Sequence, residues 1–197
     1  LYFMDFETYQ TAIPQFIGTK PYQQIPFQYS LHFLESADAT LSHQEYLACS
    51  DDSDPRLQLI ESLLKATEKP GLILTYNQSF EITRLKELSI AFPGLNEAIS
   101  ERISRIRDLM LPFQSGWIYN PEMNGSYSIK KVLPALFPDL RYEDLEIGDG
   151  GTASFAYLNS INNSNFEEVE KIRINLLEYC KMDTYAMVKL FEYLKSI

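Results

Sequence analysis

The stretch Leu1-Tyr2-Phe3-Met4-Asp5-Phe6-Glu7-Thr8-Tyr9 decides the fold of this chain. It is an apolar run with two carboxylates two residues apart, and in an extended conformation it forms a strand. Because successive side chains of a strand point to opposite faces, Asp5 and Glu7 share one face, while apolar residues cover both. Two adjacent acids repel each other, so burying them requires a neutralising charge such as a divalent cation. The stretch alone also allows an edge strand whose polar face meets water.

The composition indicates one globular domain over residues 1–197. The 197 residues are 45% hydrophobic and 13% aromatic, which is enough for a sizeable core. The chain starts inside a strand, with neither an initiator Met nor a basic segment, so we expect a domain cut from a longer protein. No stretch approaches the roughly 18 apolar residues of a membrane span, so we expect no membrane partner. Two cysteines in unrelated contexts, Cys49 and Cys180, fit a reducing cytoplasm.

The charge distribution limits how this chain can bind nucleic acid. A net charge of −10 argues against binding through a general basic surface, which neutralises phosphates with Lys and Arg. An enzyme with an acidic metal site stays possible, because local basic patches can still guide a polyanion. The densest patches are residues 101–107 and Lys130-Lys131. For both patches, a solvated helix face is the favoured interpretation.

Any metal site in this chain should use oxygen ligands. The two histidines, His32 and His43, are too few and too far apart in sequence for a zinc cluster. Carboxylate ligands favour Mg²⁺ or Mn²⁺. The acidic residues Glu143, Asp144, Glu146 and Asp149 lack the spacing of a calcium loop, and we expect them on a solvated surface.

The remaining pattern predicts an α/β domain with a mixed sheet. Proline and glycine make residues 11–26 a loop. Clean alternation over 27–34 predicts a second strand, antiparallel to the first, with its odd-numbered residues on the core side. Further elements follow in chain order: a third strand or turn near 43–49, a helix from about 54 to 69, a buried parallel strand at 72–76, a helix after 77, a helix at 95–104, a strand-like piece at 106–111, a helix at 126–136, a turn at 149–151, a loop at 160–164, and a final helix at 166–194 with one possible break.

Four carboxylates stand out by their positions on these elements. Asp5 and Glu7 share a face of the first strand. Glu81 lies where a buried strand passes into its helix, the end at which open α/β sheets bind ligands. Asp183 and Tyr179 share a face of the final helix through their i, i+4 spacing, together with apolar residues that turn towards the sheet. A carboxylate turned that way needs a partner.

Three short motifs then resemble those of the DEDD 3′–5′ exonucleases, the proofreading-type branch of the ribonuclease-H-like superfamily. The motifs are Asp5-Phe6-Glu7, Asn77-Gln78-Ser79-Phe80-Glu81 and Tyr179-Cys180-Lys181-Met182-Asp183. Tyrosine four residues before the last aspartate resembles the tyrosine subclass. Arg107-Asp108-Leu109 looks like the aspartate-bearing strand after the second motif, where Asp108 is expected mainly as a structural acceptor. Residues 125–133 resemble an uncharacterised bacterial domain of this group that occurs in larger proteins, so the resemblance spans essentially the whole chain.

The resemblance implies both a fold and a reaction. The fold is a ribonuclease-H-like mixed sheet of about five strands, the first three antiparallel, with helices on both sides. The implied function is a metal-dependent 3′–5′ exonuclease that acts on a single-stranded 3′ end of DNA or RNA. Asp5, Glu7, Glu81 and Asp183 would hold two Mg²⁺ or Mn²⁺ ions, and Tyr179 would orient the attacking water. One residue departs from the family pattern: Glu81 stands where the second motif normally has Asp. Its side chain is longer by one methylene, so either the cation or the helix would have to shift.

Other contacts and other functions are kept open. Asn77 either touches substrate or forms an Asx turn or helix cap. Phe16, in the loop after the first strand, is a candidate for base stacking, and Lys130 is a candidate substrate contact. An alternative function is a catalytically silent module that binds nucleic acid or scaffolds other domains of the parent protein. A glycosidase is disfavoured because Asp5 and Glu7 are too close in the chain to flank a sugar bond.

Overall fold

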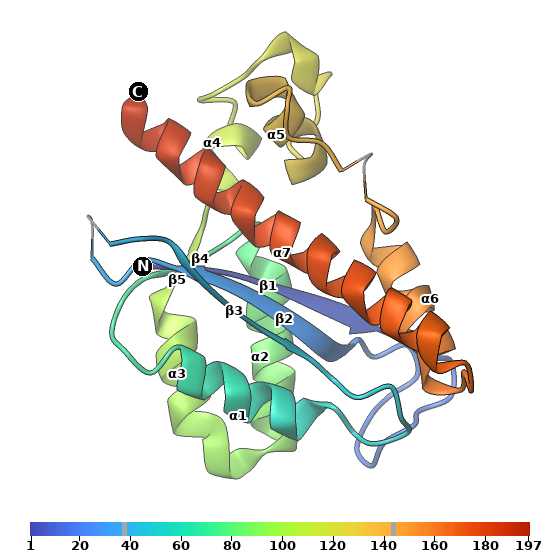
Figure 1. Ribbon diagram of the computed structural model, residues 1–197. Coiled ribbons are helices and arrows are strands. Elements are labelled where there is room, and N and C mark those ends of the chain that lie inside the picture. Colours follow the sequence, from blue (N-terminus) through green and yellow to red (C-terminus); the bar gives the residue numbers. More distant parts are fainter. Residues whose placement is uncertain (37–38, 143–144) are drawn as a thin grey trace.

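The computed structural model describes residues 1–36, 39–142 and 145–197. Its centre is a five-stranded sheet in the order β3-β2-β1-β4-β5 (Figure 1). The strands are β1 (Tyr2–Tyr9), β2 (Ile25–Phe33), β3 (Ser42–Leu47), β4 (Ile73–Thr75) and β5 (Ile106–Asp108). The pairs β1–β2 and β2–β3 are antiparallel, whereas β1–β4 and β4–β5 are parallel. The predicted α/β class, the mixed sheet and the antiparallel first three strands are therefore confirmed.

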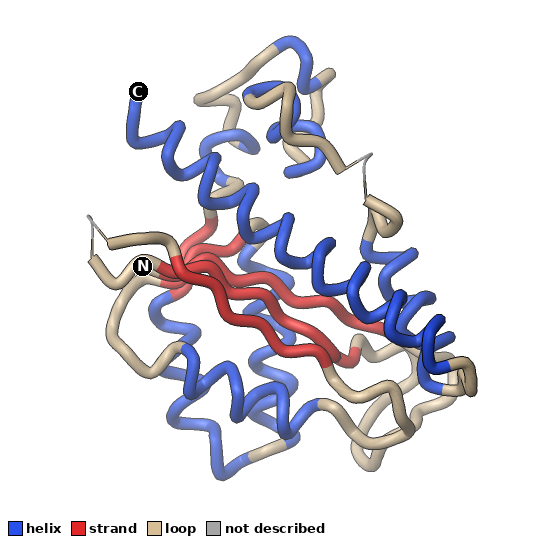
Figure 2. Tube along the Cα trace, in the orientation of Figure 1, coloured by secondary structure: helices blue, strands red, loops and turns tan. Residues whose placement is uncertain are grey.

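Helices cover both faces of the sheet, as predicted. Figures 1 and 2 show α1, α2 and α3 on one side and α5, α6 and α7 on the other. The α-helices are α1 (Arg56–Ala66), α2 (Gln78–Ala91), α3 (Asn96–Arg105), α4 (Leu111–Gln114), α5 (Ile129–Leu136), α6 (Gly150–Ile161) and α7 (Phe166–Ser196), with short 3-10 turns at Pro93–Leu95 and Pro121–Met123. No helix in the described ranges has both the length and the apolar character needed to cross a bilayer.

Alternation along β1 separates two cores. Tyr2, Met4 and Phe6 belong to a buried cluster that includes apolar residues of α1 and α2. Phe3 and Tyr9 belong to a second cluster with residues of α6 and α7. The two carboxylates of β1 lie between Phe3 and Tyr9 on that second face, as the period of two requires. The sequence-based assignment of the strand faces is confirmed for β1.

The prediction that the odd-numbered residues of β2 share one face is wrong. Both faces of the strand are covered, and a β-bulge places Phe27 on the opposite face from Tyr29 and Leu31. The β1–β2 register shifts between Glu7 and Thr8, which leaves Phe27 as an extra residue. Its ring stacks on Tyr157 of α6 with centroids 4.0 Å apart. Tyr29 packs on the other face, where its hydroxyl pairs with a serine of α1. The odd-numbered residues of β2 therefore do not share one side.

Three further features depart from the prediction. The loop after β1 ends before Ile25, so Pro26 lies inside β2 and not in the loop. The turn at 149–151 begins α6, and Asp149 caps this helix by accepting a 3.0 Å hydrogen bond from the Thr152 N–H. Helix α7 runs for 31 residues without a break. Of the acidic cluster near α6, Glu143 and Asp144 lie outside the described residues.

The two histidines are not far apart in the fold. His32 and His43 face each other across β2 and β3, with ring centroids 4.4 Å apart. Thr184 Oγ1 lies 2.8 Å from His32 Nδ1, and Ser30 Oγ lies 2.9 Å from His43 Nε2. Burial lowers the pKa of each imidazole to about 4, so both are neutral at pH 7. The pair belongs to a hydroxyl network that ties β2 and β3 to α7.

Candidate metal centre

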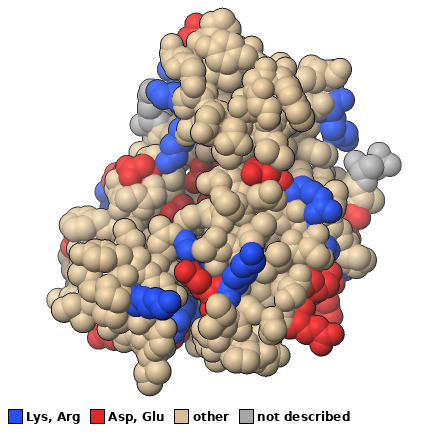
Figure 3. Space-filling model, turned by 180° about the vertical axis from the view of Figure 1, so that it is seen from behind, with Lys and Arg blue, Asp and Glu red and all other residues tan. Residues whose placement is uncertain are grey.

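The fold gathers the four predicted carboxylates from three separate parts of the chain. Asp5 and Glu7 come from β1, Glu81 from the first turn of α2, and Asp183 from α7. A cleft of about 160 Å³ opens onto three of them; its lining residues are Asp5, Phe6, Glu7, Tyr76, Ile129, Lys130, Tyr179, Asp183 and Met187. In Figure 3, acidic side chains are visible inside a hollow near the middle of the face shown. Glu81 lies behind the cleft, only 1% exposed.

Within the part of the chain that the structure describes, these carboxylates form no ion pair with a Lys, Arg or His side chain. Glu7, Glu81 and Asp183 are all buried, and Asp5 keeps part of its surface open. One oxygen each of Glu81 and Asp183, Oε2 and Oδ1, is buried with no hydrogen-bond partner in the described parts of the chain. Because unpaired buried charge is costly, the donor set fits a divalent cation, for which carboxylate oxygens are the usual ligands.

Burial raises the pKa of all four carboxyls, and repulsion by a neighbouring carboxylate adds to it for Asp5, Glu7 and Glu81. Burial is the largest cause for each of them. The charge of Asp183 raises the pKa of Asp5 further, and the charge of Asp5 raises the pKa of Glu7 and Glu81 further. Burial raises the pKa of Asp183 to about 6, against the opposing effects of two phenols and the Lys130 ammonium. The site therefore favours uptake of positive charge, as protons or as metal.

Lys130 and Tyr179 are brought together at this cleft. Lys130 Nζ donates hydrogen bonds of 2.8 Å to the phenol oxygen of Tyr179 and 2.7 Å to the carbonyl of Gly148. The same nitrogen lies 4.8 Å from the centroid of the Tyr179 ring. Its charge lowers the pKa of Asp5 and Asp183, but it bonds to neither. The predicted substrate contact Lys130 therefore lies in the cleft beside the predicted water-orienting tyrosine.

Cys180 is a neighbour of the site that the sequence reading did not include. Its Sγ lies 4.0 Å from Asp5 Oδ2, and ligand atoms of Asp5, Glu7 and Cys180 all lie within 4.8 Å of one another. Its i, i+3 spacing to Asp183 was a signal that it shares that helix face. Burial and the adjacent carboxylates raise the pKa of the thiol well above its usual value. It stays a thiol at pH 7, so the oxygens remain the ligands for a hard cation.

The turn from β4 into α2 is held by Asp108. Its carboxylate accepts the N–H groups of Asn77 at 3.0 Å, Gln78 at 3.1 Å and Met110 at 2.9 Å. Asp108 is thus a structural acceptor, as expected. Asn77 adopts a left-handed conformation with φ of 78°, and its side-chain oxygen accepts a hydrogen bond from the Ser79 hydroxyl. Asn77 stands at the start of α2, but its side chain accepts from a hydroxyl and from no backbone N–H of the described residues, so the predicted Asx turn or side-chain cap is not formed.

Asn77 also lines a second cavity that adjoins the cleft. This cavity, of about 560 Å³, has Asn77 and Tyr127 among its lining residues and shares Tyr76 and Ile129 with the carboxylate cleft. The Tyr76 hydroxyl donates a 2.7 Å hydrogen bond to the carbonyl of Tyr127, which joins the end of β4 to the segment before α5. The substrate reading of Asn77 therefore stays open beside its structural role.

Phe16 is not brought to the carboxylate cleft. Its ring lies 5.6 Å from the guanidinium carbon of Arg56, which also lies 5.8 Å from the ring of Phe92. All three residues line another cavity of about 870 Å³, formed by the loop after β1 with the start of α1 and the end of α2. The structure thus gives Phe16 a packing contact at the far end of α2 from Glu81.

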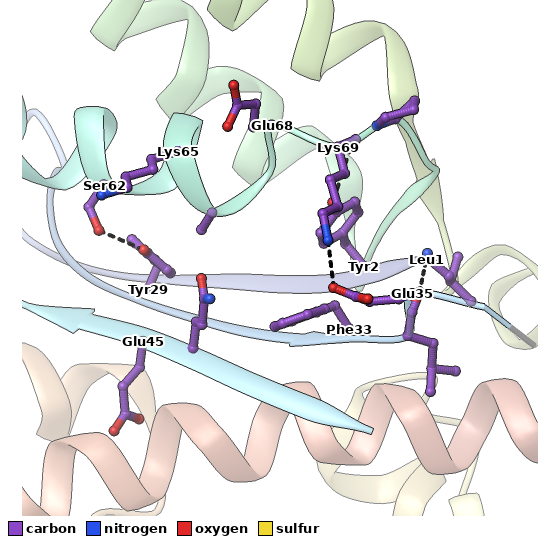
Figure 4. Close-up of a pocket in the computed structure, with 14 residues that line it drawn as sticks. Leu1, Tyr2, Tyr29, Phe33, Glu35, Glu45, Ser62, Lys65, Glu68 and Lys69 are labelled. Carbon is purple, nitrogen blue, oxygen red and sulfur yellow. Dashed lines mark hydrogen bonds and ion pairs between the residues drawn. The ribbon is translucent and has the colours of Figure 1, made fainter. Parts of the chain in front are cut away.

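A further cavity, of about 590 Å³, lies by α1 and the start of β1 (Figure 4). Its charged lining is already paired in part, because Lys69 Nζ donates a 2.7 Å hydrogen bond to Glu35. Tyr29 and Ser62, whose hydroxyls lie 2.8 Å apart, place it on the opposite face of the sheet from Asp5. It contains none of the predicted site residues.

Comparisons with known proteins place the chain among uncharacterised relatives. The model of a family described as a domain of unknown function (DUF2779) matches residues 2–128, which include Asp5, Glu7 and Glu81. An uncharacterized protein of Ureaplasma parvum serovar 3 is 28% identical over 227 residues, covering 99% of this chain and 31% of its own length. An uncharacterized protein of Mycoplasma genitalium is 25% identical over 218 residues, covering 99% and 32%. The chain thus spans about a third of these curated relatives. No solved structure matches it.

Proposed function

We propose that this chain, which belongs to the DUF2779 family, is a metal-dependent 3′–5′ exonuclease of the DEDD type on a ribonuclease-H-like fold. The observation that carries the proposal is the convergence of Asp5, Glu7, Glu81 and Asp183 without a positive partner among the described residues. Structural carboxylates that stay buried are normally paired. Four that converge beside a phenol and an ammonium group are better explained by a bound cation.

Each carboxylate has a role in holding Mg²⁺ or Mn²⁺. Asp5, Glu7 and Asp183, which line the cleft, would bind the ions, and Glu81 would complete the set of ligands. Bound there, two such ions make a water nucleophilic and stabilise the leaving 3′ oxygen of a phosphodiester. Glu81 lies behind the cleft, so it would reach its ion largely through water.

Tyr179 and Lys130 supply the remaining groups of the reaction. The Tyr179 oxygen accepts the hydrogen bond from Lys130, so its own O–H is free to donate to a water or a carboxylate. Burial raises the pKa of this phenol, so it orients water and does not act as a base at pH 7. The Lys130 ammonium, which lines the cleft, would bind an oxygen of the phosphate.

The substrate is proposed to be a single-stranded 3′ end of DNA or RNA. The cavity with Asn77 and Tyr127 adjoins the cleft and offers an aromatic ring and an amide next to the reacting phosphate. An unpaired base could stack on Tyr127, which is 46% exposed. Local contacts of this kind are needed because the net charge of −10 gives no general attraction for a polyanion.

Labelled oligonucleotides test this activity directly. Single strands labelled at either the 3′ or the 5′ end are incubated with the chain in Mg²⁺ or Mn²⁺, with Asp5→Asn as the control. We expect early release of the 3′ label, stepwise shortening of the 5′-labelled strand, and neither reaction with Asp5→Asn. No digestion with either metal, or equal digestion by Asp5→Asn, overturns the proposal.

The second candidate is a silent module that binds nucleic acid or supports other domains of the parent protein, and Glu81 in place of Asp favours it. Such a module would close its site with a Lys or Arg bonded to the carboxylates. Lys130 instead bonds Tyr179 and Gly148. Titration with Mn²⁺ separates the two candidates, because only the exonuclease requires binding there. A cytoplasmic location, favoured by free Cys49 and Cys180, belongs to the same proposal.

A further inference from the structure

A second phenol lies at the metal centre, outside all three motifs. Tyr142 belongs to the connection between α5 and α6, and it is 7% exposed. Its ring packs edge-on against Tyr179 with centroids 6.4 Å apart, and Lys130 Nζ lies 5.5 Å from its centroid. One ammonium group thus lies close to both rings. Tyr142 is therefore part of the same cluster as the predicted catalytic groups.

The hydroxyl of Tyr142 has no hydrogen-bond partner within the described ranges of the chain, although it is buried. Asp183 Oδ1 is also buried without a hydrogen-bond partner in those ranges. The two groups lie close enough to influence each other: after burial, the charge of Asp183 is the largest cause that raises the pKa of the Tyr142 phenol. A phenol O–H and a carboxylate oxygen are complementary donor and acceptor, so a hydrogen bond between them would satisfy both.

We propose that Tyr142 is a positioning residue of the metal centre, whose hydroxyl donates to Asp183 and holds that carboxylate in place as a ligand. This inference rests on the proposed metal-binding function and extends it to a residue that no motif contains. A carboxylate ligand is aimed by the groups that bond its second oxygen. Asp183 Oδ1 and the Tyr142 hydroxyl are both buried without a partner among the described residues, and Tyr142 packs against Tyr179, which shares a face of α7 with Asp183.

A role in packing alone makes a different prediction. Tyr142 belongs to the apolar cluster shared with α6 and α7, so its ring could serve only to fill the core. In that case Tyr142→Phe keeps the ring and leaves metal binding unchanged. If the hydroxyl aims Asp183, the same substitution weakens metal binding while the fold is kept.

The test is the affinity for Mn²⁺, measured by calorimetric titration without any substrate. We expect Tyr142→Phe to bind Mn²⁺ about 10- to 100-fold more weakly than the unsubstituted chain. The matched control is Tyr157→Phe, because Tyr157 is also buried but donates its hydrogen bond to the carbonyl of Cys49, outside the cleft. This control should keep the full Mn²⁺ affinity. Thermal unfolding of both variants checks that they are folded.

The outcomes separate this inference from the function it rests on. If the unsubstituted chain binds Mn²⁺ and Tyr142→Phe binds it equally well, the role of Tyr142 is overturned and the exonuclease proposal stands. If the unsubstituted chain binds no Mn²⁺, the proposed function fails and the inference fails with it. As a second readout, Tyr142→Phe should lower kcat on an oligonucleotide and leave KM unchanged, because substrate contacts are not removed.

Discussion

Lys130 Nζ lies 2.8 Å from the phenol oxygen of Tyr179 and donates a hydrogen bond to it. The lysine comes from the first turn of α5 and the tyrosine from the middle of α7. The bond fixes which atom of the phenol stays free, because an oxygen that accepts from Lys130 directs its own hydrogen elsewhere. The Lys130-Lys131 pair, which the sequence also allows as a solvated helix face, thus contributes one ammonium group to the cleft.

Removing that ammonium should slow catalysis. We expect Lys130→Met to lower kcat about 10- to 100-fold at saturating Mn²⁺, because Tyr179 loses its orienting donor and the phosphate loses a cation. Turnover of a 5′-labelled single strand measures the change. Lys131→Met is the matched control, since Lys131 is exposed on the same helix and should keep full activity. If kcat fell equally in both variants, the effect would come from the lost positive charge of the helix and not from the contact with Tyr179.

Asp183→Asn should stabilise the metal-free chain at pH 8. Because burial raises the pKa of Asp183 from 3.8 to about 6, its contribution to stability is complete below pH 4 and is lost as the pH rises through 6. The difference at pH 8 should be on the order of 1–3 kcal/mol in favour of the Asn variant, and it should vanish towards pH 4. Urea unfolding in EDTA measures it.

The same experiment with Mn²⁺ should reverse the order. The metal binds only the folded chain with its four carboxylates, so it stabilises the unsubstituted protein more than Asp183→Asn. His32 and His43 titrate in both proteins and cancel in the comparison, although their lowered pKa values destabilise each protein as the pH falls from 6.5 towards 4. A metal effect of equal size in both proteins contradicts the site.

We expect Glu81 to determine the metal concentration that the proposed reaction needs. We expect Glu81→Gln to lower activity at least roughly 100-fold, because a neutral amide leaves the second ion without its ligand charge. Glu81→Asp keeps the charge on a shorter arm, so it should retain activity but need a higher Mn²⁺ concentration for half-maximal rate. Activity as a function of Mn²⁺ concentration measures both. Glu97→Gln, at an exposed position of α3 outside the cleft, should behave like the unsubstituted chain.

Thr184 supports the site from behind. Its hydroxyl bonds Ser30 at 2.7 Å and His32 at 2.8 Å, next to Asp183 in the chain. Thr184→Val should cost about 1–3 kcal/mol of unfolding free energy, since it leaves a buried imidazole nitrogen without its partner. Thr83→Val removes an exposed hydroxyl and should change stability by at most about 0.5 kcal/mol. A urea midpoint that is equally insensitive in both variants would show that water replaces the lost bond.

The sequence alone was sufficient to predict the mixed sheet and to single out four carboxylates that the fold brings together. Period-two alternation placed Asp5 and Glu7 on one face, and i, i+4 spacing placed Tyr179 and Asp183 together. Both rules depend only on neighbours in the chain. The strand that precedes Glu81 was also marked locally, by a short apolar run and the polar turn that follows it.

Features made by distant contacts were missed. The bulge at Phe27 depends on how two strands pair, and the proximity of His32 and His43 depends on the β2–β3 register. Helix α6 begins with two glycines and has little periodic signal, so its stability comes from packing on α7 and β1. Tyr142 lies in an irregular connection, where no spacing rule applies.

Alternation along β1 also determines which changes this domain can tolerate. Side chains at Tyr2, Met4 and Phe6 meet an apolar core, whereas those at Asp5 and Glu7 meet the cleft. Inserting or deleting a single residue before Met4 would exchange the two sets, placing both acids among leucines and an aromatic ring in the cleft. Substitutions at Tyr2 and Met4, which do not line the cleft, would change the apolar core and leave the cleft unchanged. A shift in length cannot be tolerated, so the spacing within this strand should be its most strictly constrained property.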